Sequence, residues 1–589
     1  MLVVAAVAVA ACGRVNFRMD PIDAASRDAG GLDAAAIDAG AIDAGGVEAG
    51  DVDAGAIDAG GLDAGAIGLD GGGRSVTMVT VAPVTADCDP VPIVVQGSGF
   101  VGGMTVTITD SLGATIAAQT VTVLDPTNLV ASAVFAGAAP GLADLAVTWP
   151  GGGTVTSPAA VGIATSPFAT AVFVDGDTTE VPADGTRASP YPAINAGITA
   201  ARPRGVPVLV DGSTSPYAEF TLVNGASVIG CPWSAGAVRP VVTWNDRHVI
   251  ESGANAVVIA GLDFAMRLVA TGEGIVFTQG SAITIRDCKF SGDATVPDAS
   301  FVVLDRSMGV EIVDSWFTRL HHTAVPGGVR VLRVIDVRGA QGFHLHRSEL
   351  SDIGFTAAGT ALSSAIEVVR VHADAMATVY PHDVRVHNVL VHDVFQRCNG
   401  ANYLSVLDMG NVNSFDYVGV FEVYDVTIDD LRHADTPAAT NVTEGHVNGM
   451  YLSASGGTRT WRDNIVAHIA ETDDVMVAGS SSYYGAWCDG FLVPGPSPQP
   501  MSNSLVFDVG TPLPVGANSV DWASGFVNQV TAGTGSFRNS DAIDPGFVLT
   551  DGPSFYHPTN PAIATGASDG GEMGAFGGPE GSWTPLSQR

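Results

Sequence analysis

Residues 283 to 290 read ITIRDCKF, and the same arrangement of residue types returns several times along the chain. Similar octets begin at 310 (VEIVDSWF), 343 (FHLHRSEL), 384 (VRVHNVLV) and 421 (FEVYDVTI), and an earlier copy, VVIAGLDF, begins at 257. In each copy apolar residues alternate with other residues over four positions, as in a half-buried strand, and Asp, Asn, Gly or Arg follows. A unit that recurs at such intervals predicts a stack of similar coils rather than one globule.

The residue that follows each short strand is interpreted as a corner of the coil. Asp, Asn and Gly tolerate the left-handed backbone conformation that turns a chain sharply between two strands. Alignment of the copies predicts one column of corners, with Asp463 and Asn503 as later members: Gly261, Asp287, Asp314, Arg347, Asn388 and Asp425. Successive corners lie between 26 and 41 residues apart, so the later coils are expected to carry longer loops.

The segments at both ends of this stack point to the same architecture. Before it, SPYPAINAGITAA at 189–201 has Ile194 and Ile198 at helical spacing, which predicts a short amphipathic helix. After it, the chain contains DPGF at 544–547, NPAI at 560–563 and GAFGG at 574–578. With these features, residues 171–577 resemble the right-handed parallel β-helices of the pectate-lyase-like class, in which such a helix caps the open end of the stack.

Between residues 75 and 165 short Val/Thr-rich alternations are separated by Gly and Pro turns. The runs VPIVVQGSGF, MTVTITDSLG, QTVTVLD, LVASAVF and ADLAVTWPGGG predict at least five strands, as in an antiparallel β-sandwich. GSGF at 97–100, VTI at 106–108 and PGLADLAVTWPGGG from 140 resemble the IPT/TIG immunoglobulin-like domain. In that family the domain is a spacer or binding module of surface proteins, and this copy has no recognisable catalytic grouping.

The first residues, MLVVAAVAVAACGR, form an apolar run that ends in a cysteine. The run is shorter than the about 20 residues of a membrane-spanning helix and is typical of a signal peptide. VAAC at 9–12 resembles the bacterial lipobox, which implies a lipid anchor at Cys12, and Gly13 after it implies the outer membrane or cell surface. From Asp23 to Asp63 an acidic residue falls at every fifth position. This segment is expected to be a disordered linker, because it has too few apolar residues to form a core.

The predicted organisation is all-β. It comprises a lipoprotein signal peptide (1–12), an Asp/Ala/Gly-rich linker (13–74), an Ig-like β-sandwich (75–166), a right-handed parallel β-helix with an N-terminal capping helix (167–578) and a C-terminal tail (579–589). The formal net charge of −35 argues against nucleic acid as a partner, because little basic surface is available for phosphates. A monomer is expected.

Besides Cys12 the chain has five cysteines, at 88, 231, 288, 398 and 488. Their spacing predicts neither a zinc site nor a disulfide framework, and an odd number leaves at least one thiol free. Cys398 with Cys488 is the pair that we would test first. Cys88 is expected to be a small buried residue rather than a reactive thiol.

Alternation assigns two inward and two outward positions to each strand before a corner. The inward positions are all apolar, which supports the alignment. In the coils between residues 344 and 424 the outward positions hold six functional side chains: His344, His346, Arg385, His387, Glu422 and Tyr424. Neighbouring coils lie about 4.8 Å apart, close enough for these groups to act together.

Enzymes of the pectate-lyase-like class place their sites on the outer face of a parallel sheet, so this patch is a candidate catalytic site. A polysaccharide lyase needs a base, a cation that neutralises the uronic carboxylate, and an acid. Either His346 or His387 could be the base. Arg385 could neutralise the carboxylate and Tyr424 could be the acid.

Three other interpretations of the patch remain open. A glycoside hydrolase needs two carboxylates at a defined separation, and the patch offers Glu422 with Glu311 two coils away. Three histidines could bind zinc, although Arg385 among them argues against a metal, and no metal site is assigned. Polar residues also face outward simply because water is there.

Other candidates are weaker. His392, Asp393, His446 and Tyr451 lie on or beside large insertions, where sites often occur. The pair at 321–322 is expected to be a solvated loop. Calcium is the one cofactor that the sequence suggests, at the acidic pairs 429–430 and 473–474, although adjacent acids are more often simply exposed.

The sequence thus supports two functions. The first is a lipid-anchored surface protein that binds polysaccharide or another cell-surface ligand without catalysis. The second is a polysaccharide lyase or glycoside hydrolase that acts through the His/Arg/Glu/Tyr patch.

Overall fold

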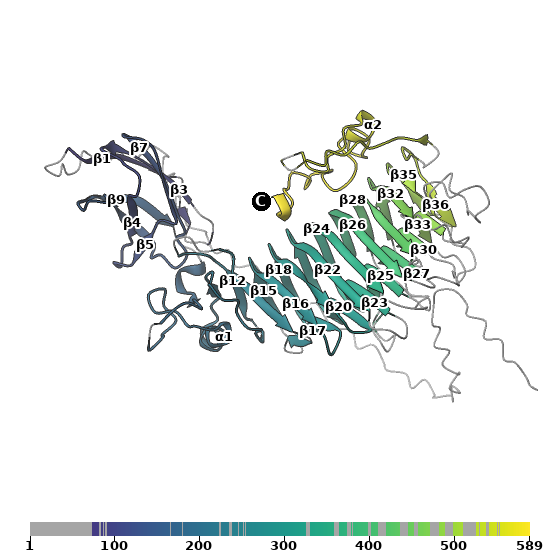
Figure 1. The fold of residues 1–589 in the computed structure, drawn as a ribbon, viewed down its shortest axis with the longest axis horizontal. Helices are drawn as coiled ribbons and strands as arrows, with labels where there is room; N and C mark the ends of the chain where they lie inside the picture. Colours follow the sequence, from purple (N-terminus) through teal and green to yellow (C-terminus); the bar gives the residue numbers. More distant parts are fainter. Residues whose placement is uncertain are drawn as a thin grey trace, which may run out of the picture. The chain divides into compact units, whose positions relative to one another are not determined.

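The computed structural model describes most of the chain from residue 73 to residue 588 (Figure 1). The residues between these limits that it does not describe are 82–83, 86–87, 89–90, 165–166, 180, 223–224, 235–237, 246, 251–252, 254, 325–329, 358–363, 374–378, 380, 399–401, 410–419, 436–445, 453–457, 472–481, 489–498, 510–525, 529, 538–540, 551 and 553. The expected signal peptide with Cys12 and the acidic repeat therefore lie outside the described residues.

The described chain is all-β, and its N-terminal part contains two antiparallel sheets. One has the order β1 (Ser75–Val81), β3 (Val91–Ser98), β7 (Asn128–Ala133), β6 (Thr120–Asp125). The other has the order β2 (Val84–Thr85), β9 (Thr154–Ala164), β8 (Gly141–Thr148), β4 (Thr105–Thr109), β5 (Thr115–Ala117), with β2 parallel to β9. Side chains of both sheets, among them Ile93, Ile108 and Leu145, share one hydrophobic core. The five expected runs thus all fall in strands, and further short strands complete the sheets.

Large parallel sheets make up most of the remaining chain. The longest comprises seventeen strands of the described residues: β10 (Val172–Val174), β11 (Val208–Val210), β12 (Ser227–Gly230), β13 (Val241–Asn245), β15 (Asn255–Ala260), β16 (Asp263–Leu268), β18 (Ser281–Arg286), β19 (Lys289–Ala294), β21 (Met308–Val313), β22 (Trp316–Ala324), β24 (Gln341–Ala357), β26 (Val384–Cys398), β28 (Val420–Ile428), β29 (Leu431–Asp435), β31 (Thr458–Arg462), β32 (Ile465–Glu471) and β35 (Leu505–Val509).

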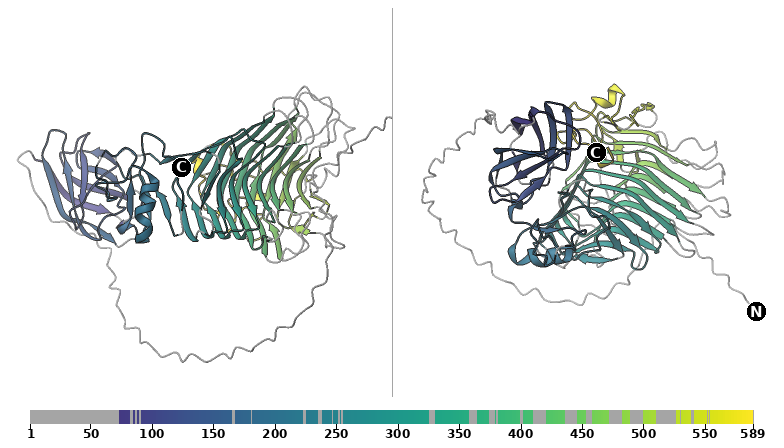
Figure 2. Two further views of the ribbon diagram at one scale, coloured as in Figure 1. Left: turned by 90° about the horizontal axis from the view of Figure 1, so that it is seen from below. Right: turned by 60° about the vertical axis from the view of Figure 1, so that its left-hand side comes forward.

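A second parallel sheet has nine strands within the described part of the chain: β14 (His248–Ile250), β17 (Glu273–Thr278), β20 (Asp298–Asp305), β23 (Arg330–Arg338), β25 (Ser364–His372), β27 (Asn402–Met409), β30 (His446–Leu452), β33 (Ser482–Cys488) and β36 (Phe526–Asn528). A short parallel pair joins β34 (Gln499–Met501) to β37 (Val530–Ala532). Figure 2 shows the strands of the long sheets side by side in chain order.

The strand register agrees with the sequence alignment. Ile283 pairs with Val257 on one side and Val310 on the other, and the same offset continues through β24, β26 and β28. The residues expected to face inward are buried, and they join one core that runs the length of the parallel sheets. Phe264, Phe290 and Phe317 stack on one another in this core, with ring centroids 5.0 and 4.6 Å apart.

The predicted corner column is confirmed. All eight of its members have a positive φ, between 43° at Arg347 and 64° at Gly261. The paired residues on either side place the members of the column next to one another, so the turns are aligned, and the later members Arg347, Asn388 and Asp425 lie within long strands. Asn and Asp adopt this left-handed conformation at a smaller cost in conformational free energy than a β-branched residue does.

The expected helix is α1 (Ile194–Ala201), in which Ile194 and Ile198 are buried. Both belong to the same core as β10 and β11, so the helix covers the apolar end of this core. A second short helix, α2 (Pro561–Ala564), begins the C-terminal segment. None of the helices in the described residues has the length and apolar character that a membrane crossing requires.

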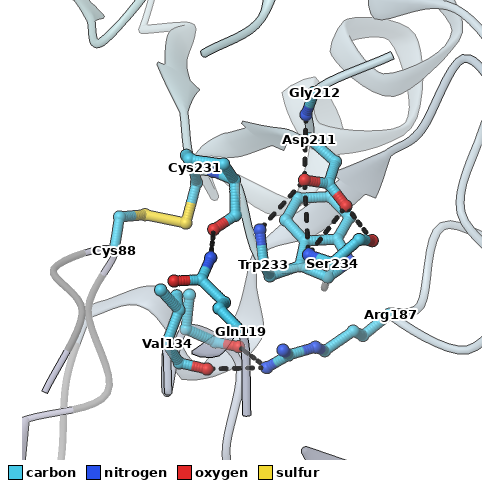
Figure 3. Close-up of a disulfide and its surroundings, with 11 residues drawn as sticks. Cys88, Gln119, Val134, Arg187, Asp211, Gly212, Cys231, Trp233 and Ser234 are labelled. Carbon is cyan, nitrogen blue, oxygen red and sulfur yellow. Dashed lines mark hydrogen bonds between the residues drawn. A yellow bond between two sulfur atoms is a disulfide. The ribbon is translucent and has the colours of Figure 1, made fainter. Parts of the chain in front are cut away.

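Cys88 forms a disulfide with Cys231, which corrects the expectation that Cys88 is a small buried residue (Figure 3). The link joins a loop between the antiparallel strands to the residue after β12. Arg187 donates to the carbonyls of Val134 and Ala136 at 3.3 and 2.9 Å, which adds polar contacts near the disulfide. Cys288 is a free, buried thiol, and the side chains of Cys398 and Cys488 lie outside what is described.

The last described residues pack against the long sheet instead of forming a separate tail. The Thr427 hydroxyl accepts from the Ala575 amide at 2.9 Å, and the Asp463 carboxylate accepts from the Ser568 amide at 2.6 Å. Further toward the C-terminus, the Glu580 carboxylate contacts His346 of β24 at 3.0 Å, and the Ser587 amide contacts Glu349 of the same strand at 3.4 Å. The segment of residues 568–587, which we call the C-terminal strap, therefore runs back across successive strands (Figure 1).

Candidate functional site

The parallel register brings the six outward residues of the predicted patch together. His344, Arg385 and Glu422 form one row across β24, β26 and β28. His346, His387 and Tyr424 form the next row across the same three strands. The sequence therefore placed these six residues correctly relative to one another.

Within the patch, His344, His346 and His387 form a close group that we call the histidine cluster. One ligand atom from each residue can be chosen such that all three lie within 4.8 Å of one another. His344 and His346 alternate along β24, and their rings stack with centroids 4.1 Å apart. His346 and His387 are 5% and 2% exposed, so the cluster lies mostly below the surface.

The corner residue Asn388 fixes the orientation of the His387 ring. The Asn388 Nδ2 donates to the carbonyls of Ala575 and Gly577 at 3.1 and 2.7 Å, which leaves its Oδ1 as an acceptor. The Nδ1 of His387 lies 2.7 Å from that Oδ1 and must therefore carry the proton. The Nε2 of His387 is then the nitrogen with a free lone pair, and it lies 2.5 Å from the His344 Nε2.

Two glutamates complete the surroundings of the histidine cluster. The His346 Nδ1 lies 3.0 Å from Glu580 of the C-terminal strap, and its Nε2 lies 3.1 Å from Glu311 of the neighbouring strand β21. Burial would raise the pKa of Glu580, but the hydrogen bond from His346 and the nearby imidazoles lower it. Glu580 was not foreseen, because nothing in GGPEGSW marks one acidic residue as a partner of histidines far away in sequence.

Burial is the main cause that lowers the pKa of His344, to about 3, and the neighbouring histidines lower it further. Burial also lowers the pKa of His387, against the hydrogen bond to Asn388. A lowered pKa makes an imidazole a weaker base, which disfavours both rings for the proton transfer that a lyase needs. Neutral imidazole is instead the form that binds metal ions.

The remaining patch residues are engaged with protein partners. Arg385 pairs with Glu422 at 2.9 Å, and the Arg385 side chain is 52% exposed. Tyr424 stacks on His387 with ring centroids 4.6 Å apart. The Arg462 guanidinium lies over the Tyr424 ring, 4.6 Å from its centroid. Burial raises the pKa of Tyr424, followed by the charges of Glu422 and Glu580. The cation and acid expected for a lyase are present, but the strap lies over the candidate bases.

A second polar group lies on the nine-stranded sheet and was missed by the sequence reasoning. We call it the arginine–carboxylate cluster: Arg333, Asp336, Arg338, Glu367, Arg370 and His372. The register alternates the charges, since Arg333 lies beside Glu367 and Asp336 lies beside Arg370 on adjacent strands. The octet repeat covers only the strands before the corners, so it carried no signal for this other sheet.

The carboxylates of the arginine–carboxylate cluster are buried and ionised. Burial would raise the pKa of Asp336, but the hydrogen bond from His372 and the charges of Arg333 and Arg338 hold it well below its usual value. Glu367 behaves alike, because Arg370 and Arg333 lower its pKa to about 2 against the effect of burial. Two permanently charged carboxylates cannot act as the protonated acid that glycoside hydrolysis needs.

The arginines of this cluster are held in place but remain accessible. The side chains of Arg333, Arg338 and Arg370 are 18%, 24% and 26% exposed. Two strands beyond Glu367 in the same row lies Asn448, which is fully buried and has no hydrogen-bond partner for either amide atom among the described residues.

The weaker candidates from the sequence have structural roles. His392 lies between Glu349 at 3.0 Å and Asp393 at 2.7 Å, and these carboxylates raise its pKa to about 9 although burial lowers it. Tyr451 is buried, and the side chain of His446 lies outside what is described.

The pair at 321–322 corrects the expectation of a solvated loop, because both residues lie on β22. His322 is 1% exposed, stacks on Phe355 and contacts the Val296 carbonyl. Two adjacent polar residues suggested a loop, but His322 instead occupies a buried position of a strand.

The first acidic pair offers little to calcium. Asp429 is 4% exposed and accepts hydrogen bonds from Tyr556 and His468 at 3.0 and 2.6 Å. Asp430 pairs with Arg432. Calcium needs several free oxygen ligands, and these carboxylates already have protein donors. The second pair, 473–474, lies outside the described residues.

The chain was compared with protein-family models, curated proteins and solved structures. None of the three comparisons produced a match.

Proposed function

We propose that this protein is an extracytoplasmic, lipid-anchored β-helix protein that binds an acidic polysaccharide without cleaving it. The long parallel sheets with aligned left-handed corners support a β-helix of the pectate-lyase-like type. Parallel strands joined by crossovers are right-handed in nearly all proteins, which supports a right-handed helix. The two antiparallel sheets around one core support an Ig-like domain before it.

The proposed location rests on two independent features. VAAC at 9–12 resembles a lipobox, with Cys12 as the lipidated residue. The Cys88–Cys231 disulfide fits an oxidising compartment, because structural disulfides are rare in the cytosol. A surface position at the outer membrane is the proposal that follows from both.

The arginine–carboxylate cluster carries the proposal of polysaccharide binding. Arg333, Arg338 and Arg370 are held by buried carboxylates, and each side chain stays partly exposed. Guanidinium groups in fixed positions recognise carboxylates through paired N–H donors. The three arginines lie on two neighbouring strands, β23 and β25, so together they suit a polymer that presents several carboxylates close to one another. A polyuronate is the ligand class with this chemistry.

Binding is favoured over catalysis by the state of the titratable groups. In the histidine cluster the pKa of His344 lies at about 3, and the strap covers His346 and His387. In the arginine–carboxylate cluster the pKa values of Asp336 and Glu367 are lowered, so neither carboxyl is an available acid. The polysaccharide lyase remains the alternative that the experiment below distinguishes.

The test measures binding of the purified chain to polygalacturonate, alginate and a neutral glucan by calorimetry, with ultraviolet absorbance recorded for unsaturated ends. We expect the acidic polymers alone to bind, more weakly as salt rises. Arg338→Lys keeps the charge but loses the planar fork, and should weaken binding at least tenfold. Arg432→Gln, at an exposed arginine of the other sheet, should leave binding unchanged.

Two results would contradict the proposal. Equal binding by wild type and Arg338→Lys would show that the arginine–carboxylate cluster is not the binding site. The absence of binding to either acidic polymer would show that polyuronates are not the ligand. A rise in absorbance with polyuronate would establish the lyase alternative instead.

A further inference from the structure

We propose that the histidine cluster, together with Glu580, is a binding site for a divalent transition-metal ion, with zinc as the expected occupant. The site is independent of polysaccharide binding, because it lies on the seventeen-stranded sheet and shares no residue with the arginine–carboxylate cluster. Imidazole nitrogens with one carboxylate oxygen are typical zinc ligands.

The Nε2 atoms of His344 and His387 face each other, which is the first observation that points to a metal ion. The Nε2 atoms of His344 and His387 lie 2.5 Å apart, which is closer than an ordinary N–H hydrogen bond. Asn388 holds the proton of His387 on Nδ1, so the lone pair of its Nε2 faces His344. Without an ion, His344 can donate its Nε2 proton to this lone pair; a cation in place of that proton would be shared by both nitrogens. Two nitrogens bound to one zinc ion lie about 3.3 Å apart, so the rings need to separate by less than ~1 Å.

The second argument is that two of the three rings, those of His346 and His387, already have the partner that orients a metal ligand. Metal-binding histidines usually donate their second N–H to a carboxylate or a carbonyl. His387 donates to Asn388, and His346 has a carboxylate at each nitrogen, Glu580 at 3.0 Å and Glu311 at 3.1 Å. Whichever nitrogen of His346 binds the ion, the other keeps a carboxylate partner.

Glu580 is the fourth ligand, because it is the carboxylate that the strap brings against the cluster, 3.0 Å from the His346 Nδ1. Glu311 contacts the ring of His346 from the neighbouring strand and serves as the orienting partner. Three imidazoles and one carboxylate give the four-coordinate set of a closed zinc site.

The nearby arginine does not oppose this assignment, although the sequence suggested that it would. Arg385 forms an ion pair with Glu422 at 2.9 Å and its side chain is half exposed, so its charge is compensated at the surface. Calcium and magnesium are excluded by chemistry, since they prefer sets of oxygen ligands over imidazole.

The consequence is structural. Three ligands come from the strands β24 and β26, and the fourth comes from the C-terminal strap. A bound ion would add a coordination link to a strap that already packs Phe576 and Trp583 against Leu390 of β26. With four protein ligands and two of the rings buried, the site leaves no open position for substrate, which is typical of structural zinc.

The test uses the full chain without an affinity tag, stripped with a chelator and titrated with zinc chloride in a calorimeter. We expect one tight equivalent per chain and a rise in the thermal midpoint on zinc addition. Asn388→Ala should weaken zinc binding 10- to 100-fold, as expected for a residue that orients a ligand. His387→Ala should abolish the tight equivalent. His321→Ala, at an exposed histidine of β22, is the control and should bind as wild type does.

A second measurement separates loss of the site from loss of the fold. Glu580→Gln lies outside the strands, so it should keep the circular dichroism of wild type while it weakens zinc binding at least tenfold. Zinc should also slow proteolytic release of the strap in wild type and not in Glu580→Gln. The proposal is overturned if wild type takes up no tight equivalent, or if His387→Ala and Glu580→Gln bind zinc as tightly as His321→Ala does.

Discussion

At the scale of single residues, members of the corner column share a positive φ but differ in their surroundings. Asp287 has a side chain that is 43% exposed, whereas Asp425 is 2% exposed and one of its carboxylate oxygens has no partner among the described residues. Burial raises the pKa of Asp425 to about 7, and the charge of Asp463 contributes in the same direction. The same backbone requirement is therefore met by carboxyl groups that differ widely in burial.

Asp425 predicts a dependence of stability on pH. Its folded form keeps a proton up to about pH 7, whereas the unfolded carboxyl loses it near pH 4. Its contribution to stability is thus complete below pH 4 and is lost as the pH rises to 7. We expect Asp425→Asn to remove this loss of unfolding free energy between pH 4 and 7. The loss amounts to at most a few kcal/mol, because one pKa unit corresponds to ~1.4 kcal/mol.

Urea unfolding at pH 4, 5.5, 7 and 8 measures this effect, with Asp287→Asn as the matched control. The control should follow the wild-type curve. If Asp425→Asn loses as much stability between pH 4 and 7 as wild type does, the carboxyl is not protonated in the folded state.

At the scale of elements, the structure contains a second column of left-handed residues that the sequence did not reveal. These residues precede the inward strand positions: Ala256, Ala282, Gly309, Gly342 and Asp383, with φ between 50° and 69°. Two of the positions hold alanine, which gives no turn signal in a sequence, and yet the backbone bends there. A residue with a Cβ pays about 1–2 kcal/mol in this conformation, and glycine does not.

We expect Ala282→Gly to stabilise the chain by about 0.5–1 kcal/mol, because the relief of strain exceeds the extra entropy of glycine in the unfolded state. Ala282 is exposed, so the change removes no core contact. Ala265→Gly, at an exposed position of β16 with ordinary strand geometry, is the control and should destabilise. The urea midpoint measures both, and a lower midpoint for Ala282→Gly would contradict the expectation.

At the scale of the whole molecule, the Cys88–Cys231 disulfide spans 143 residues. A cross-link over such a loop restricts the unfolded chain, and its removal typically costs about 2–4 kcal/mol. We expect Cys88→Ser combined with Cys231→Ser to lower the free energy of unfolding by this amount. Dithiothreitol should destabilise wild type and leave the double variant unaffected. An equal response of both proteins to the reductant would show that the two thiols are not bonded.

The candidate site was predictable only in part, and the histidine cluster shows where the limit lies. His344, His346 and His387 were expected on one outer face, because alternation and a constant register follow from residues within each strand. The burial of His346 and His387 and the contact with Glu580 belong to the tertiary structure, because sequence patterns did not place the strap there. The arginine–carboxylate cluster was missed altogether, since the octet repeat covers the strands of the other sheet and carries no signal for this one.

The sequence by itself determined the repeat, its turns and the direction in which each side chain of the octets points. These properties are local: a strand alternates between its two faces, and a left-handed corner selects among a few residue types over one or two positions. Only the tertiary structure decided that Glu580 meets His346 across 234 positions, and that Cys88 meets Cys231. Such contacts depend on how the chain returns on itself, and no short-range preference of a glycine-rich segment or an isolated cysteine specifies that path.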